Sequence, residues 1–255
     1  MTNAPTLTAA PNTRLIFRSL LRADFIIFLK NRRALIISIL LPYLILQSTN
    51  SEAATAHLGG ALFVIGLALT FGLASTSIMG YPLAVARDRE KGVFQRLRVT
   101  PAPTWAIMTS RLLLQVLANL IIALFVVIIG GRIHHLSFSI GQYAMVLLVS
   151  ILGGIMFLCI GQALVALVKS SDTVNATARF VYIALIFLGL FGQGGTGTWS
   201  TIARWSPVQT LMSILAGVLK LSAWSAHDTE SLLCVVGYSV VFAVIGIRWF
   251  KWEVR

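Results

Sequence analysis

Charged residues are scarce in this chain of 255 residues, since Asp, Glu, Lys and Arg make up only 11% of it. A soluble domain carries roughly 25%. Hydrophobic residues account for 57% of the sequence, and the mean hydropathy is +0.87. This composition argues against a water-soluble fold and predicts a membrane protein built of helices.

Metal-binding and disulfide chemistry have few candidates in the sequence. The cysteines, Cys159 and Cys234, both lie in apolar runs, so we expect buried thiols rather than a disulfide framework or paired metal ligands. His134 and His135 share a short loop without an acidic neighbour, and we interpret them as loop histidines rather than metal ligands. We therefore predict no catalytic residue and no metal site.

Six apolar segments are each close to the roughly 20 residues that a helix needs to cross the hydrocarbon of a bilayer. A further stretch, residues 208–221, is only about 14 residues long, which favours a re-entrant helix over a full crossing. The expected fold is an all-α membrane protein with six transmembrane helices and a re-entrant external segment, at about residues 196–221, before the last span. The predicted spans are at about residues 34–49, 58–84, 112–129, 140–168, 180–195 and 232–247.

The chain before the first predicted span divides into two parts. Residues 1–12 are rich in Thr, Ala, Asn and Pro, and we interpret them as a disordered cytosolic tail. Residues 13–33 carry Arg14, Arg18 and Arg22 at intervals of four, which predicts an amphipathic helix lying in the membrane interface. The basic residues at its end are expected to contact lipid phosphates, with a merely solvated basic face as the alternative.

The distribution of basic residues supports six spans with both termini in the cytosol. All but three of the 20 Lys and Arg residues then lie on the cytosolic side, as the positive-inside rule requires. A seventh crossing would place the basic C-terminus outside. Membrane topology thus accounts for the net charge of +12, and binding to nucleic acid loses its support. The outer basic residues are Arg132, Arg204 and Lys220.

The predicted spans hold no Asp, Glu, Lys or Arg near their middle. An ion-coupled secondary carrier is therefore disfavoured, and an intramembrane protease with two paired carboxylates has no candidates. The amides within the spans are Gln115 and Asn119, four residues apart on one face, and Gln162. We expect them either to join helices through hydrogen bonds or to line a substrate path.

The loop between predicted spans two and three is the most charged segment outside the N-terminal helix. It reads RDREKGVFQRLRVTPAPTW from Arg87 to Trp105. Gly92 permits a sharp change of direction, and Phe94 and Leu97 supply an apolar patch among the charges. This combination predicts a docking surface for another protein, with contact to lipid headgroups as the alternative.

The same loop contains Glu90, Gly92, Leu97, Thr100 and Pro101 in the order E-x-G-x-x-x-x-L-x-x-T-P. This pattern resembles the signature of ATP-binding-cassette (ABC) type-2 permeases, the membrane subunits of many bacterial drug, multidrug and polymer exporters. The basic N-terminal helix is similar to the connecting helix of that family. The stretch before the last span resembles the external re-entrant helices of the family, although its glycine-rich start departs from the proline-containing segment of many relatives.

The resemblance implies a transmembrane domain over residues 34–255, with a coupling loop at about residues 86–105 that fits a groove on a nucleotide-binding subunit. Contact with that subunit is expected from Glu90, Gly92, Phe94 and Leu97, with Asp88, Arg89 and Lys91 adding salt links or steering. Gln115, Asn119 and Gln162 are candidates for the substrate path.

The energy for transport has to come from a partner, because the sequence contains no G-x-x-x-x-G-K-[ST] loop to cradle a phosphate. The resemblance implies an ATPase subunit that binds ATP and Mg²⁺, and a second permease copy or a related chain, in the bacterial inner membrane. A path without ionised groups suits a drug-like or lipid-like substrate. Export of a lipid-linked polysaccharide and ion-coupled secondary transport are the alternatives.

Overall fold

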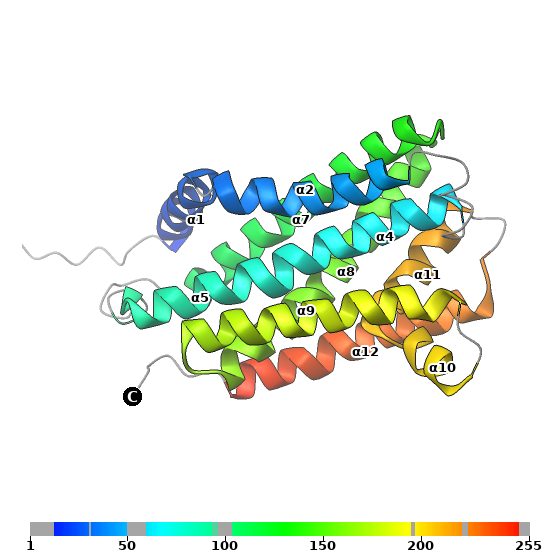
Figure 1. Cartoon of the computed structure of the whole chain (residues 1–255). Helices are drawn as coiled ribbons and strands as arrows, with labels where there is room; N and C mark the ends of the chain where they lie inside the picture. The colour runs from blue at the N-terminus through cyan, green and yellow to red at the C-terminus, as the bar shows by residue number, and fades with distance from the viewer. Residues whose placement is uncertain are drawn as a thin grey trace, which may run out of the picture.

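A computed structural model of the chain describes residues 13–30, 32–49, 60–93, 95, 104–194, 197–220 and 224–249. Within these residues every regular element is a helix, as the predicted all-α fold requires, and the long helices lie side by side in a bundle (Figure 1). In chain order the elements are α1 (Thr13–Lys30), α2 (Arg32–Ser48), α4 (Ala61–Ala74), η1 (Ser75–Gly80), α5 (Tyr81–Glu90), α7 (Thr104–Ile133), α8 (Ile140–Leu167), α9 (Ser171–Gly194), α10 (Thr198–Arg204), α11 (Pro207–Leu219) and α12 (Ala226–Arg248).

Five helical segments among the described residues are long and apolar enough to cross a membrane, and they match predicted spans two to six. The chain is therefore a multi-pass membrane protein. The first predicted span falls on α2, whose apolar part, Ser38–Ser48, is shorter, so the sixth crossing stays a prediction. The predicted tail at residues 1–12 lies outside the described residues. The five segments are Ala61–Glu90, Ala106–Ile133, Ile140–Leu167, Ser171–Leu190 and Ala226–Arg248.

Local sequence signals explain where two of the helices begin. A capping box starts α8, in which the Ser139 hydroxyl accepts from the backbone N–H of Gln142 and the Gln142 side chain accepts from the backbone N–H of Ser139. Helix α11 starts at Pro207, directly after Ser206, whose hydroxyl accepts from the backbone N–H of Gln209. Such side chains satisfy the donors that the first turn of a helix leaves without partners.

The α4 helix forms the centre of the bundle. Its residues from Val64 to Ala74 are all buried, and it packs against α2, α7, α8 and α11. In the most apolar window of Ala61–Glu90, 78% is buried inside the protein, compared with 17% for Ala226–Arg248. A helix that is apolar all round has to be enclosed by others, whereas the outward apolar face of α12 suits contact with lipid tails.

The α4, η1 and α5 helices form one continuous rod, which contains a π-helical turn at Ser75–Gly80. Pro82, near the start of α5, has no N–H to donate, and the wider turn directly precedes it. Helix α8 packs closely against this turn at Gly161, where a Cβ atom would collide with the carbonyl oxygen of Ser77. The absent side chain of Gly161 thus lets the two helices approach.

Helices α10 and α11 connect α9 to α12. Because α12 begins at the end of the bundle where α9 finishes, the connection leaves and rejoins the same end (Figure 1). Helix α11 is buried on most of its surface. Its Leu211 packs against Gly153, near the middle of α8. The carbonyl oxygen of Leu219, at its other end, accepts from Gln142 near the start of α8. The predicted re-entrant segment falls on α10 and α11, and its re-entrant path stays a prediction.

Candidate functional site

One end of the bundle, here called the basic end, holds α1, the last turn of α5, the starts of α7 and α9 and the ends of α8 and α12 (Figure 1). The predicted coupling loop begins there. The opposite end, here called the far end, holds the starts of α8 and α12 together with α10 and α11 (Figure 1). The described part of the predicted loop is residues 86–93, 95, 104 and 105, while Phe94 and Leu97 lie outside the described residues.

Arg89 points into the protein rather than into solvent, with only 5% of its surface exposed. Its Nη1 donates to the carbonyl oxygen of Val165 at 3.0 Å, and its Nη2 donates to the carbonyls of Val168 at 2.7 Å and Lys169 at 2.6 Å. These oxygens belong to the end of α8, where the last carbonyls have no partner within the helix. A cation at a helix C-terminus also complements the helix dipole.

Glu90 contacts the next helix along the chain. Its Oε1 accepts from the backbone N–H of Ser171, the first residue of α9, at 2.6 Å. A carboxylate at a helix N-terminus satisfies a free donor and complements the positive end of the dipole. Arg89 and Glu90 are adjacent, and they therefore bind the two sides of the turn between α8 and α9, each with the charge that its helix end favours.

Asp88 extends the same network to the other side of α5. Its Oδ2 lies 2.6 Å from Nη1 of Arg111 in α7. One residue earlier in α7, the Ser110 hydroxyl donates to Oδ2 of Asp24 in α1 at 2.6 Å. The last turn of α5 is thus linked to α7, α8 and α9, and α7 is linked in turn to α1.

The chain turns sharply after α5, as the sequence predicts. Gly92 has a φ of 66°, in the left-handed region that glycine adopts without strain. The backbone N–H of Lys91 still donates to the carbonyl of Arg87, and the N–H of Gly92 to that of Arg89. Glu90 and Lys91 have exposed side chains, so this turn presents charge at the surface of the basic end.

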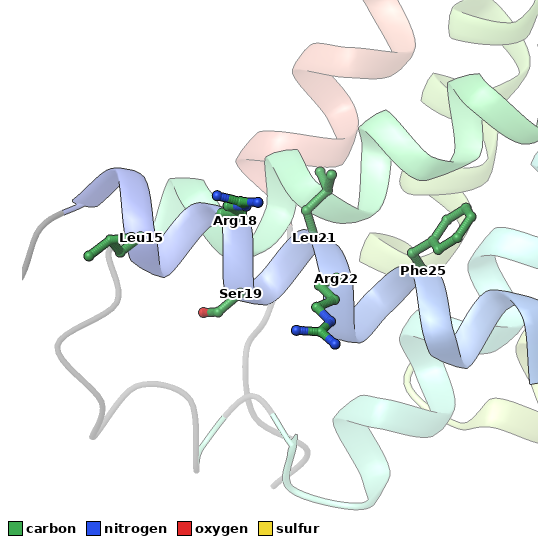
Figure 2. Close-up of a pocket in the computed structure, with 6 residues that line it drawn as sticks. All are labelled: Leu15, Arg18, Ser19, Leu21, Arg22 and Phe25. Carbon is green, nitrogen blue, oxygen red and sulfur yellow. The ribbon is translucent and has the colours of Figure 1, made fainter.

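The predicted amphipathic helix is present as α1, and a groove of about 530 Å³ runs along it. Figure 2 shows Arg18 and Arg22, one turn apart, among the apolar side chains of this helix. Arg18, Arg22 and Leu15 are exposed. The groove is lined by Leu15, Arg18, Ser19, Leu21, Arg22 and Phe25.

The predicted amides of the spans differ in their surroundings. Asn119 is buried, and it accepts from the Thr76 hydroxyl at 2.5 Å and donates to the Ser77 hydroxyl at 3.0 Å. Gln162 accepts from the phenolic hydroxyl of Tyr81 at 2.7 Å. Asn119 thus joins α7, and Gln162 joins α8, to the rod formed by α4, η1 and α5. Gln115 is half-buried on α7.

Sequence reasoning missed the role of several partners in these contacts. Ser171 follows the short polar run after α8 and is a recognisable helix start, so its need for an acceptor was detectable. Asp24 was detectable as the single acidic residue of α1. Nothing in the sequence indicates that Arg89 would meet carbonyls from residues 165–169.

Polar contacts at the far end centre on Asp228 in α12. Its Oδ1 accepts from the hydroxyl of Ser213 in α11 at 2.5 Å, and its Oδ2 accepts from the backbone N–H and the hydroxyl of Ser225 at 2.8 and 2.9 Å. Nearby, Nε of Arg204 donates to Nε2 of His227 at 3.1 Å. These contacts join α10 and α11 to the start of α12.

The loop between α7 and α8 holds the paired histidines. Burial, and then the neighbouring His135, lower the pKa of the His134 imidazole below its ordinary value, which favours a neutral ring. Across the described ranges, no group of three or more His, Cys, Asp and Glu side chains could hold a metal ion.

The sequence matches a known protein family. A model of the ABC-2 type transporter family matches residues 13–219. The match runs from the first residue of α1 to the last residue of α11 and includes the whole α5 to α9 network at the basic end. Among curated proteins, none matches this sequence.

Proposed function

The chain belongs to the ABC-2 type transporter family and is a membrane-spanning transport subunit, and we propose that it moves a hydrophobic or amphipathic substrate out of the cytoplasm with energy from a separate ATPase. The match of the family model over residues 13–219 is the observation that carries this proposal. The sequence has no phosphate-binding loop of its own. ATP and Mg²⁺ therefore bind to the partner subunit.

The partner ATPase docks at the basic end. Support comes from the sharp turn at Gly92 and from the exposed charges of Glu90 and Lys91. Phe94 and Leu97 supply the apolar contact, and Asp88 is held in place by Arg111. A second permease copy, or a paralogue, completes the path across the inner membrane.

The topology has six spans, with α2 as the first and both termini in the cytoplasm. Helix α2 has 17 residues, which corresponds to about 25 Å at ~1.5 Å per residue, against a hydrocarbon thickness of roughly 30 Å. Basic residues lie at the start of α2 and at the ends of α5 and α12, which fits a cytoplasmic position for these helix ends. Helices α10 and α11 then form the re-entrant segment on the outer side.

The substrate class rests on the chemistry of the spans. Apart from Arg179, which lies near the middle of Ser171–Leu190, the five described candidate spans carry no ionised side chain near their middle, and this largely uncharged set of spans suits a drug-like or lipid-like molecule. Asn119 and Gln162 use their amides to hold helices together, and of the candidate path residues Gln115 is the one best placed to meet substrate. Export of a lipid-linked polysaccharide is the second candidate, because its phosphates fit the arginines of α1.

Copurification tests the docking surface directly. Phe94→Asp places a charge in the apolar contact, and we expect it to insert in the membrane normally but to lose the ATPase during purification. Phe94→Leu at the same position keeps an apolar side chain and should retain the partner. An intact complex with Phe94→Asp would refute this docking surface. Reconstituted vesicles would then show whether candidate substrates stimulate ATP hydrolysis.

A further inference from the structure

We propose that Arg89 and Glu90 are positioning residues that clasp the turn between α8 and α9, so that a displacement of the loop after α5 moves α5, α8 and α9 together. This inference rests on the proposed function, because the partner ATPase supplies the displacement. It concerns what happens after docking, inside the permease, and not the docking contact itself.

The geometry separates the two roles within one short segment. The guanidinium of Arg89 is buried and bonded to three carbonyls at the end of α8. The guanidinium therefore makes its contacts within the permease and is not available for contact with a partner. Glu90 is exposed but already accepts from the first N–H of α9. The exposed side of Glu90 and the turn that follows, at Lys91 and Gly92, are the parts that remain for the partner.

The contacts of Arg89 and Glu90 with the two helix ends are here called the clasp. The charges of the clasp match the helix ends that they bind. The carbonyl end of α8 carries partial negative charge and receives the cation, while the N–H end of α9 carries partial positive charge and receives the anion. Arginine suits this position because its planar fork can donate to several acceptors at once. A lysine has one compact ammonium group, so Arg89→Lys should retain only part of the clasp.

The clasp lies where a link between helices has mechanical value. The α5 helix continues without a break into η1 and α4, at the centre of the bundle. Helices α8 and α9 are joined on this side by the short turn at residues 168–170. Rigid elements transmit a displacement when they have defined contacts at both ends, and the clasp provides one such contact at the point of entry.

Transport assays with the reconstituted permease–ATPase complex test the functional side of the proposal. Arg89→Gln should lower ATP-dependent transport roughly tenfold, the size expected for the loss of a coupling contact, while copurification and ATP hydrolysis stay close to wild type. Arg89→Lys should recover part of the transport. The control is Arg248→Gln, which removes an exposed arginine at the same end of the bundle and should leave transport unchanged. Wild-type transport in Arg89→Gln, or a complex that no longer assembles, would overturn the proposal.

Distance measurements separate a coupling role from a merely structural one. Nitroxide labels at Arg87→Cys and Thr173→Cys, both exposed positions, report the separation of α5 from α9 once Cys159 and Cys234 are replaced by serine. We expect the same distance in the nucleotide-free and vanadate-trapped states of the parent complex, and two different distances after Arg89→Gln. A distance that changes in the parent, or one that is unaffected by Arg89→Gln, contradicts the clasp.

The same labels distinguish failure of the clasp from failure of the proposed function. If the permease binds no ATPase, the proposed function fails, and the label pair is measured on the permease alone in lipid nanodiscs. The clasp then predicts a narrow distance distribution in the parent and a broad one in Arg89→Gln. Equal widths would overturn the clasp in that case as well.

Discussion

The basic end and the far end of the bundle are held together in different ways. At the basic end, side chains of α5 bind helix ends that are 76 to 81 positions away in the sequence. At the far end, Asp228 binds Ser213, 15 positions away, and Arg204 binds His227, 23 positions away. The first pattern joins separate spans, whereas the charged side chains of the far end stabilise the local path of α10 and α11 into α12, and the long-range bond from Gln142 to Leu219 there is uncharged.

This difference indicates which end is suited to transmit movement. Charged bonds between distant spans require that those spans keep their relative positions, so a force on one of them reaches the others. Bonds between neighbouring segments fix only a local fold. The contrast predicts that loss of the charged contacts between spans at the basic end impairs coupling as well as stability, while comparable changes at the far end affect stability alone.

Reversal of the charge at Arg89 should give the largest effect. Arg89→Glu places a carboxylate against the carbonyl oxygens at the end of α8, and we expect it to lower the free energy of unfolding by about 3 kcal/mol or more, the cost typical of breaking a buried charged contact. Thermal denaturation of the purified protein in detergent measures this change. The control, Arg248→Glu, alters an exposed residue at the same end, and an equal loss of stability there would remove the special position of Arg89.

Removal of the Asp228 carboxylate should have the next largest effect, at the far end. Asp228→Ala deletes three hydrogen bonds of one carboxylate, and because these bonds are not additive and a hydrogen bond to a charged group contributes roughly 1.5–3 kcal/mol, we expect a net loss of about 2 kcal/mol. Denaturation in detergent should show it, while copurification with the ATPase stays intact. Loss of the ATPase from Asp228→Ala would mean that the two ends do not act separately.

The ion pair between Asp88 and Arg111 should contribute less, since both side chains are partly exposed, at 32% and 15%. A double-mutant cycle with Asp88→Asn and Arg111→Gln should give a coupling free energy of about 1 kcal/mol, within the range for surface ion pairs. The cycle is measured by the same denaturation assay. Additive effects of the two substitutions would show that this pair does not join α5 to α7 in the membrane.

The contact between Arg204 and His227 should matter least. Arg204→Gln removes one exposed hydrogen bond between α10 and α12, and the expected change in stability is within about 0.5 kcal/mol, as for most surface substitutions. Transport in vesicles should match wild type. A transport defect in Arg204→Gln would give the far end a part in the transport cycle that its local contacts do not predict.

The positions of the spans were predictable from the sequence because hydropathy is a local property. The five described candidate spans coincide with predicted segments, and residues such as Ser139 and Ser206 begin helices through contacts only three positions long. The coupling role of the loop after α5 stays a prediction from its motif, and Gly92 adopts the predicted turn. The part that sequence reasoning interpreted differently is Arg89, which was expected to face a partner and is instead bonded inside the chain.

The amides of the spans teach the same lesson. The sequence did not decide whether Asn119 and Gln162 join helices or line a substrate path. Their partners, Thr76, Ser77 and Tyr81, come from the rod formed by α4, η1 and α5, which is distant in the sequence and against which α7 and α8 pack. Such pairing depends on how helices are arranged around one another, and no interval within one helix encodes it.

The amino-acid sequence by itself determined where the helices lie, that they belong in a membrane and which loop carries the family signature, because apolar runs, caps and motifs involve consecutive residues. Only the tertiary structure decided which charges are exposed and which bind the ends of neighbouring helices. The physical reason is that the carbonyl and N–H groups at helix ends are the same in every sequence, and only their position in space selects the side chain that satisfies them.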